Sequence, residues 1–181
     1  MDVEKKYPKT YEAIMTAFAG ESQARNKYDF FAKTARKEGH QKLAEFFEET
    51  ARNEQEHAKL LFKLVSGIGN TQENLVAAAS GEHYEHTSMY PGMEEVAKAE
   101  GFADAENLFR LLAKVEEEHE NRFKRLLGDL KDETLYSSKD GEKVAWVCRK
   151  CGNVHYGKQA PVKCPVCAHP QGYYERKDNS Y

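Results

Sequence analysis

The sequence predicts an all-α four-helix bundle that carries metal ligands, followed by a small β-rich domain organised around a second metal site. Four stretches between residues 8 and 130 repeat apolar side chains at three- and four-residue steps, the period of a helix that faces a core. All four cysteines fall in the last fifth of the chain as two C-x-x-C pairs. We therefore expect a helical domain over residues 1–132, a linker over 133–143 and a metal domain over 144–181.

Composition and charge narrow the functional classes. The 181 residues are 40% hydrophobic, enough for one cored domain and a small second module, and the net charge of −3 offers nucleic acid no basic surface. No run of eighteen apolar residues is present, and the charged segment Met1–Lys6 lacks the apolar centre of a signal peptide. We expect a cytoplasmic protein without nucleic-acid or membrane partners, whose cysteines bind metal rather than form disulfides.

The first predicted helix spans residues 8–37. Pro8 suits its first turn, and Gly39 ends it. At about 100° per residue, Glu21 lies within about 60° of Phe18, inside the apolar stripe. A carboxylate in that position is unfavourable unless another group pairs with it.

The second predicted helix, residues 41–66, places a carboxylate and an imidazole on one face. Glu54 lies near the centre of its apolar stripe, and His57 lies at the edge, about 80° from Phe47. Side chains three residues apart share a helical face, so both can reach one metal ion. The short link 67–70 then turns the chain back, as an antiparallel neighbour requires.

The third predicted helix, residues 72–89, has few large apolar residues, and acidic side chains fill its inward face. Glu82 and Glu85 point inward together with His86, for which we favour a structural role. His83 is expected to be a solvated surface histidine. The small alanines beside the inward acids indicate a helix that approaches its neighbours closely and contributes ligands.

Helix-breaking residues separate the third helix from the fourth. Pro91-Gly92 is expected to break or kink the chain, residues 93–100 to resume a helix, and Gly101 to end it. The fourth helix is predicted over residues 104–130, with Asp104 as its N-cap.

The fourth helix contains the acidic run Glu116–Glu120, and the helical period selects among its members. Glu116 and His119 lie within about 40° of Leu112, inside the apolar stripe. The two glutamates between them project outward as solvated charge. The spacing of Glu116 and His119 repeats that of the Glu-x-x-His on the second helix.

Five carboxylates and two imidazoles thus face inward from the four helices. Without cations they would repel one another and lie unsolvated. Carboxylates can bridge two metals and imidazole favours iron over magnesium or calcium, so the set suits a di-iron site that passes electrons in pairs, as splitting an O–O bond requires. The residues are Glu21, Glu54, His57, Glu82, Glu85, Glu116 and His119.

The cysteine pairs predict a tetrahedral four-thiolate site, because twelve residues separate two C-x-x-C knuckles. A zinc ribbon offers the same ligands, but the neighbouring di-iron site needs a one-electron donor and therefore favours a single iron. A module of fewer than about 40 residues depends on such a metal to fold. Trp146, Tyr156 and Tyr174 are expected to pack it. The ligands are Cys148, Cys151, Cys164 and Cys167.

Together these motifs resemble those of the rubrerythrin family, and the likeness covers nearly the whole chain in the family's order. The matching segments are Ala19–Arg25, Glu54–His57, Gly81–Glu85, Met89–Pro91, Glu116–His119, Cys148–Gly152 and Cys164–Cys167. The resemblance implies a ferritin-like di-iron bundle followed by a rubredoxin-like domain. It also implies a non-haem peroxidase of oxidative-stress protection, which reduces hydrogen peroxide to water with electrons that enter through the rubredoxin-type iron from rubredoxin or an NAD(P)H-dependent reductase.

The resemblance assigns roles to the inward residues. Glu54 and Glu116 match the family's bridging carboxylates. In the family one iron exchanges a Glu ligand for a His on reduction, which makes Glu85 and His57 the two poles of a catalytic switch. The terminal ligands implied are Glu21 and Glu85 on one iron, and Glu82 and His119 on the other.

The resemblance also concerns residues around the metals and the assembly. Tyr28 and Tyr90 match tyrosines that hydrogen-bond the ligand carboxylates. Ala168 departs from the pattern, because rubredoxins usually have Gly there. The family commonly forms homodimers, in which the rubredoxin domain lies near the partner's di-iron site. Some members exchange helices, and the loop 67–71 is where that choice would be made.

Two other functions fit parts of the pattern. Iron oxidation and storage, as in a ferroxidase, would use the same bundle, but a storage protein needs no built-in electron donor such as the four-cysteine domain. Alternatively, the cysteines could form a structural zinc ribbon used for binding, with the helices as a scaffold.

Overall fold

The computed structural model describes residues 3–177. Helices make up the chain as far as residue 131, and a small antiparallel sheet follows, so the predicted fold class is confirmed. The chain divides into two compact units, residues 1–70 and residues 71–181.

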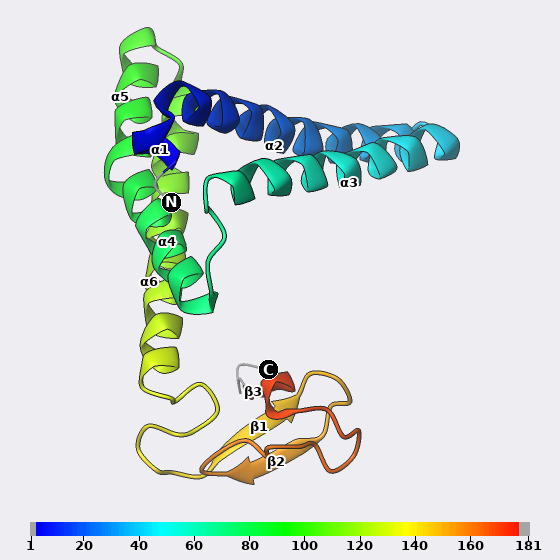
Figure 1. Cartoon of the computed structure of the whole chain (residues 1–181), viewed down its shortest axis with the longest axis vertical. Coiled ribbons are helices and arrows are strands. Elements are labelled where there is room, and N and C mark those ends of the chain that lie inside the picture. Colours follow the sequence, from blue (N-terminus) through cyan, green and yellow to red (C-terminus); the bar gives the residue numbers. More distant parts are fainter. Residues whose placement is uncertain (1–2, 178–181) are drawn as a thin grey trace. The chain divides into compact units, whose positions relative to one another are not determined.

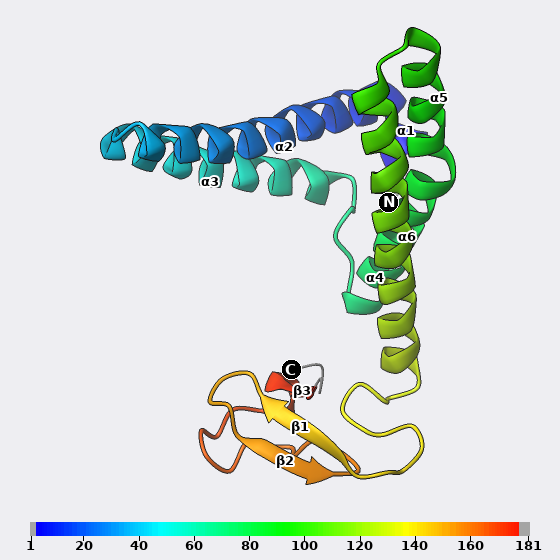
Figure 2. The same cartoon turned by 180° about the vertical axis from the view of Figure 1, so that it is seen from behind.

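The first unit is an antiparallel pair of long helices, α2 (Pro8–Lys37) and α3 (Gln41–Leu64), preceded by the short α1 (Val3–Lys6). Figures 1 and 2 show α2 and α3 side by side along their length. Gly39 makes the turn between them with a φ of +85°, a value that favours glycine. Both helices end within two residues of the predicted positions.

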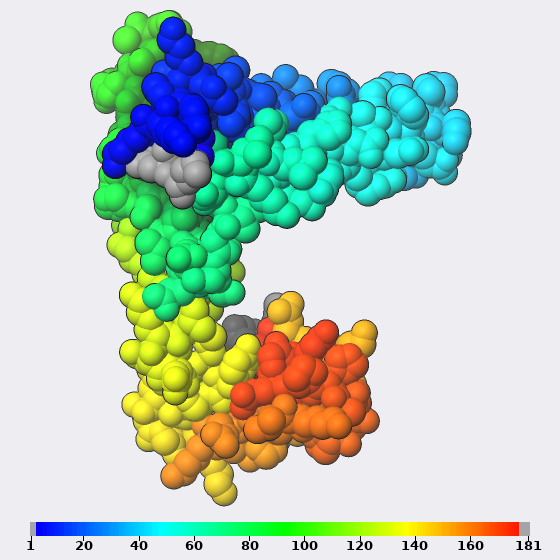
Figure 3. Space-filling view, viewed as in Figure 1, coloured from blue at the N-terminus to red at the C-terminus, as the bar shows by residue number. Residues whose placement is uncertain are grey.

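Small side chains let α2 and α3 approach closely. Ala32, Ala35 and Ala44 are buried against one another, with Phe47 packed on them. Nearer the loop between the units, the rings of Phe18 and Phe62 stack with centroids 4.8 Å apart. The space-filling view shows the two helices in contact (Figure 3).

The second unit begins with three helical segments, α4 (Thr71–Tyr84), a π-helical turn η1 (Glu85–Met89) and α5 (Tyr90–Glu100). The chain does not break at Pro91-Gly92, because α5 runs through both residues, whereas a kink there stays a prediction. Proline lies in the first turn of α5, where its missing N–H costs no hydrogen bond. The irregularity falls one turn earlier, in η1. Gly101 ends α5 with a φ of +76°, as predicted.

Helix α6 (Ala103–Lys131) packs along α4 and α5. The predicted N-cap is wrong by two residues, because Phe102 holds the N-cap position and makes no side-chain cap. Asp104 lies in the first turn instead, where its charge complements the helix dipole.

The C-terminal module is a three-stranded antiparallel sheet with strand order β2-β1-β3. The strands are β1 (Val144–Cys148), β2 (Val154–Gly157) and β3 (Tyr174–Arg176), and the 3-10 turn η2 (Gln171–Tyr173) precedes β3. Trp146 pairs with His155 on one side and Arg176 on the other.

Five buried residues form the core of this module: Trp146, Cys148, Ala160, Cys164 and Tyr174. Trp146 donates its indole N–H to the carbonyl oxygen of Gly157 at 3.1 Å. The expectation that Trp146 and Tyr174 pack the module is confirmed, whereas Tyr156 is 70% exposed and does not. The core is small and contains two of the four cysteines.

Among residues 3–177, no helix is both long enough and apolar enough to cross a membrane. Several large apolar side chains of the helices are nevertheless exposed, among them Phe31, Leu43, Leu108 and Leu111.

Candidate metal centre

A first cluster of two carboxylates and one imidazole lies between α2 and α3. Glu21 comes from α2, whereas Glu54 and His57 come from one face of α3. His57 Nδ1 lies 2.8 Å from Glu54 Oε2 and 3.8 Å from Glu21 Oε2. One ligand atom of each residue lies within 4.8 Å of the others, so all three can reach one ion.

A second cluster with the same composition lies between α4 and α6. Glu82 comes from α4, and Glu116 and His119 come from α6. His119 Nδ1 lies 2.7 Å from Glu116 Oε2 and 3.7 Å from Glu82 Oε2, which repeats the distances of the first cluster. The His119 side chain is 40% exposed, whereas that of His57 is 56% exposed.

Neighbouring carboxylates within each cluster perturb one another. A hydrogen bond with Glu54, followed by burial, raises the pKa of Glu21. Burial, followed by a hydrogen bond with Glu116, raises the pKa of Glu82. Ionising both members of such a pair places two like charges side by side, so each cluster favours a bound cation.

The donors of these clusters fit iron. Carboxylate and imidazole groups together suit first-row transition metals, and two such clusters supply the donor set of a di-iron site. Six of the seven predicted ligands lie in one cluster or the other. Glu85 lies in neither; it begins the π-helical turn η1, and its charge contributes to the raised pKa of Glu82.

The two tyrosines that were predicted to hydrogen-bond ligand carboxylates, Tyr28 and Tyr90, have different surroundings. Burial, and then the charge of Glu116, raises the pKa of Tyr90, so this hydroxyl lies close to the second cluster. The ring of Tyr28 packs against Phe31 and Phe47 with centroids 6.3 Å and 6.2 Å away.

The four cysteines converge at one end of the small module. Their sulfur atoms approach in two pairs, with 3.7 Å between Cys148 Sγ and Cys167 Sγ and 3.7 Å between Cys151 Sγ and Cys164 Sγ. A tetrahedral metal with bonds of about 2.3 Å to sulfur separates its ligands by about 3.8 Å. The thiols are therefore already spaced for one tetrahedral ion, as a rubredoxin-type iron site requires.

The two cysteine knuckles share one backbone design. The N–H of Gly152 donates to the carbonyl oxygen of Cys148 at 2.8 Å, and the N–H of Ala168 donates to that of Cys164 at 2.9 Å. Both turns require a positive φ, which is +77° at Gly152 and +60° at Ala168. A hydrogen bond from Tyr174, helped by the backbone N–H groups of residues 166 and 167, lowers the pKa of Cys164 to about 6.

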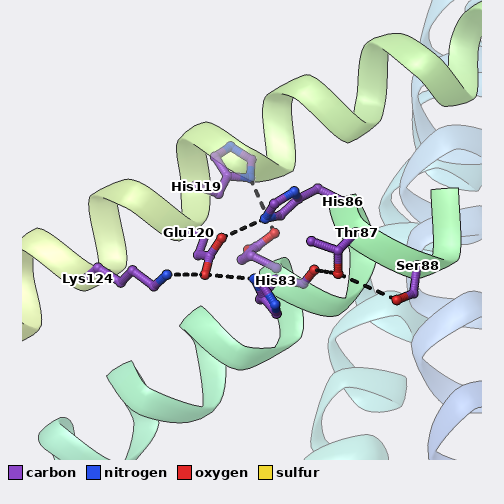
Figure 4. Close-up of polar contacts among 8 residues, drawn as sticks. His83, His86, Thr87, Ser88, His119, Glu120 and Lys124 are labelled. Atoms are coloured by element: carbon purple, nitrogen blue, oxygen red, sulfur yellow. Dashed lines mark hydrogen bonds and ion pairs between the residues drawn. The ribbon is translucent and has the colours of Figure 1, made fainter. Parts of the chain in front are cut away.

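A third polar group next to the second cluster was not predicted. Glu120 is 5% exposed, and its carboxylate contacts His83, His86 and Lys124 (Figure 4). Hydrogen bonds, first from Lys124 and then from His86, lower the pKa of Glu120 to about 2. His83 is exposed as expected but pairs with Glu120, and His86 is partly buried. The helical period could have indicated that Glu120 faces inward, since Glu120 lies about 40° from Glu116 around the helix.

Comparison with known proteins gives matches to both parts of the chain. The family model described as "Rubrerythrin" matches residues 12–127, and that described as "Rubrerythrin, rubredoxin-like domain" matches residues 146–175. These ranges contain the two Glu/His clusters and the four cysteines, respectively.

Several relatives match over almost the full length. The chain is 45% identical to "Rubrerythrin" of Porphyromonas gingivalis, with 100% of this chain and 96% of that protein covered. It is 42% identical to "Rubrerythrin" of Nitratidesulfovibrio vulgaris, covering 94% of this chain and 95% of that protein. To "Nigerythrin" of the same organism it is 32% identical, covering 90% and 83%.

Proposed function

Because the chain belongs to the rubrerythrin family, we propose that it is a non-haem di-iron peroxidase that protects the cell against oxidative stress. Hydrogen peroxide would accept two electrons and two protons and yield two molecules of water. The electrons would enter through the rubredoxin-type iron from rubredoxin or an NAD(P)H-dependent reductase.

The observation that carries this proposal is the presence of two kinds of metal donor set in one chain. The Glu/His clusters suit irons that act on oxygen species, whereas the tetrahedral thiolate site suits transfer of one electron at a time. A ferroxidase needs only the first kind. A reductase of peroxide uses both, since two electrons must reach the O–O bond for each turnover.

We propose that the two Glu/His clusters combine into one dinuclear site, because three protein ligands per cluster leave each ion open for a bridge and for substrate. In this arrangement Glu54 and Glu116 would each help to hold both irons. The remaining terminal ligands are Glu21 and Glu85 on one iron and Glu82 and His119 on the other.

His57 and Glu85 are proposed to exchange at one iron as its oxidation state changes. The position of His57 at the edge of the apolar stripe of its helix supports this, since a side chain that moves needs free space. The π-helical turn that begins at Glu85 gives the backbone there a less regular hydrogen-bond pattern than an α-helix.

Side chains next to the irons would supply hydrogen bonds during the reduction of peroxide. When bound, the irons supply the electrons that cleave peroxide. Tyr90 stays protonated because burial and the neighbouring carboxylates raise its pKa, so its hydroxyl can donate a hydrogen bond at the second cluster. Glu82, whose pKa is raised by burial and by the neighbouring Glu116, would lose its proton when it binds an iron. We propose a corresponding hydrogen-bonding role for Tyr28 at the first cluster.

We further propose a homodimer in the cytoplasm with domains at residues 1–132 and 144–181 joined by a 133–143 linker. Two C-x-x-C pairs that together hold a metal are typical of a reducing compartment, where thiols stay available as ligands. The exposed apolar side chains of α2, α3 and α6 offer surfaces for pairing two chains.

The experiment that tests this function is a single turnover. The anaerobically reduced, iron-loaded protein is mixed with hydrogen peroxide, and the absorbance of both iron types is followed. We expect the di-iron centre to be reoxidised with the loss of one peroxide per two electrons, and repeated turnover when an NADH-linked donor is added. If peroxide left the reduced di-iron centre unchanged while oxygen and ferrous iron produced a mineral core, the protein would be a ferroxidase.

A further inference from the structure

Among residues 3–177, Glu120 is the one charged residue that is buried. The function proposed above assigns it no role. It lies on α6 directly after His119 but points to a different set of neighbours. Burying a carboxylate is unfavourable without charged or hydrogen-bonding partners, so its surroundings indicate what this position is built to hold.

Two histidines on adjoining turns converge on this carboxylate. His86 Nε2 lies 2.6 Å from Glu120 Oε2, and His83 Nδ1 lies 3.1 Å from Glu120 Oε1. The two imidazole rings stand nearly perpendicular, at 87°, with centroids 5.3 Å apart. Figure 4 shows both rings turned toward Glu120 from the neighbouring helical segment.

The spacing of these atoms suits metal coordination. One ligand atom from each of the three residues lies within 4.8 Å of the others. In a tetrahedral ion with bonds of about 2.1 Å, ligand atoms lie about 3.4 Å apart, so small rotations of His83 and His86 would suffice. A donor set of two imidazoles and one carboxylate is typical of divalent zinc and iron.

The group is also accessible. His83, Glu120 and Lys124 line an open pocket of about 350 Å³ between α4 and α6, whose other lining residues are mainly apolar. An ion can therefore enter from solvent and keep water in its fourth position. The three residues belong to neither of the Glu/His clusters described above.

We propose that His83, His86 and Glu120 form an accessory site for one divalent first-row transition ion, separate from the di-iron centre and the cysteine site. The ammonium group of Lys124 contacts Glu120 Oε1 at 2.5 Å and takes the place of this ion when none is bound. Its side chain is 59% exposed, so it can swing into solvent as the ion enters.

Zinc uptake by the iron-loaded full-length protein tests this site. Equilibrium dialysis against Zn²⁺, with zinc and iron counted per chain, should show one zinc bound while all iron is retained. His83→Ala should lose this zinc, and it should still fold because His83 is largely exposed. The matched control is His40→Ala, an exposed histidine outside the three clusters, which should bind zinc as the parent does.

A second variant moves affinity in the opposite direction. Lys124→Met removes the cation with which zinc competes, so zinc should bind about fivefold more tightly. A misfolded variant cannot produce this gain. The proposal is overturned if His83→Ala binds as much zinc as the parent, if each zinc bound displaces an iron, or if Lys124→Met fails to tighten binding. Since the test compares variants with the iron sites filled, its result does not depend on peroxidase activity.

Discussion

His57 Nδ1 lies 2.8 Å from Glu54 Oε2 on the same face of α3. The same pairing recurs in the second unit between His119 and Glu116, at 2.7 Å. An i, i+3 spacing on a helix produces both contacts, and in each case a glutamate from an adjacent helix approaches the same imidazole. The two Glu-x-x-His motifs thus build two matching halves of a donor set.

Removing the carboxylate of Glu54 should abolish di-iron binding. In Glu54→Ala the first cluster retains only Glu21 and His57, and the proposed bridge is missing. We expect peroxidase turnover to fall at least about 100-fold, while the absorbance of the cysteine-bound iron is unchanged. Iron analysis and steady-state kinetics measure both. Glu56→Ala serves as the control, because Glu56 pairs with Lys59 away from the cluster and should leave iron content and turnover intact.

Replacing His57 tests the proposed ligand exchange. His57→Leu should still bind oxidised iron through the carboxylates, but its reduced state would lack the imidazole that replaces Glu85. We expect normal iron content in the oxidised protein and reoxidation by peroxide slowed by about 10- to 100-fold. Stopped-flow measurements on the reduced protein provide the rate. A rate equal to that of the parent would rule out the exchange.

The sequence was sufficient for the parts of the fold that rest on periodicity. The bounds of α2, α3 and α6, and the inward position of Glu54 and Glu116, follow from apolar residues repeated at helical spacing. The cysteine site followed from the C-x-x-C spacing, because short knuckles hold their thiols close whatever surrounds them.

Features set by tertiary contacts were not predictable in this way. No residue pattern in the sequence predicts the π-helical turn at Glu85–Met89. Pro91 led us to expect the irregularity at residues 91–92, which instead lie within α5. The sequence does not single out Glu120, because this residue ends an acidic run in which Glu117 and Glu118 are solvated. Its burial depends on His86 and Lys124, and only the packing of α6 against the segment before α5 brings His86 to it.

Helix exchange between two chains can be detected by complementation. Glu54→Ala damages only the first unit, and Glu116→Ala damages only the second. If each di-iron site takes its two clusters from different chains, co-expressing both variants creates dimers in which one site has two intact clusters. We expect about a quarter of the parental activity at equal, random pairing. Activity no greater than that of either variant alone would show that each site belongs to a single chain.

Removing the hydroxyl of Tyr174 should make the cysteine-bound iron more sensitive to acid. Tyr174 donates a hydrogen bond that lowers the pKa of Cys164, so Tyr174→Phe raises that pKa. Protons then compete with iron for the thiolate at higher pH. The pH at which the sulfur-to-iron absorbance is half lost should rise by about 0.5. Tyr173→Phe is the control, since the Tyr173 ring contacts His169 and should not change this pH.

The two cysteine knuckles allow a reciprocal test of backbone strain. Gly152 and Ala168 occupy equivalent turns with positive φ, and only Gly152 adopts this conformation without strain. Ala168→Gly should therefore stabilise the metal domain by about 1 kcal/mol, whereas Gly152→Ala should destabilise it by about as much. A methyl group at Gly152 would meet no atom within 4 Å, so the cost comes from the backbone alone.

Denaturant unfolding of the iron-loaded chain, followed by the sulfur-to-iron absorbance, measures both changes in free energy. Gly128→Ala in α6 is the control, because Gly128 lies in a regular helix and outside the metal domain. It should leave this transition unmoved. Shifts of the transition in the same direction for Ala168→Gly and Gly152→Ala would contradict this prediction. Backbone strain at Ala168 would then not lower the stability of the metal domain.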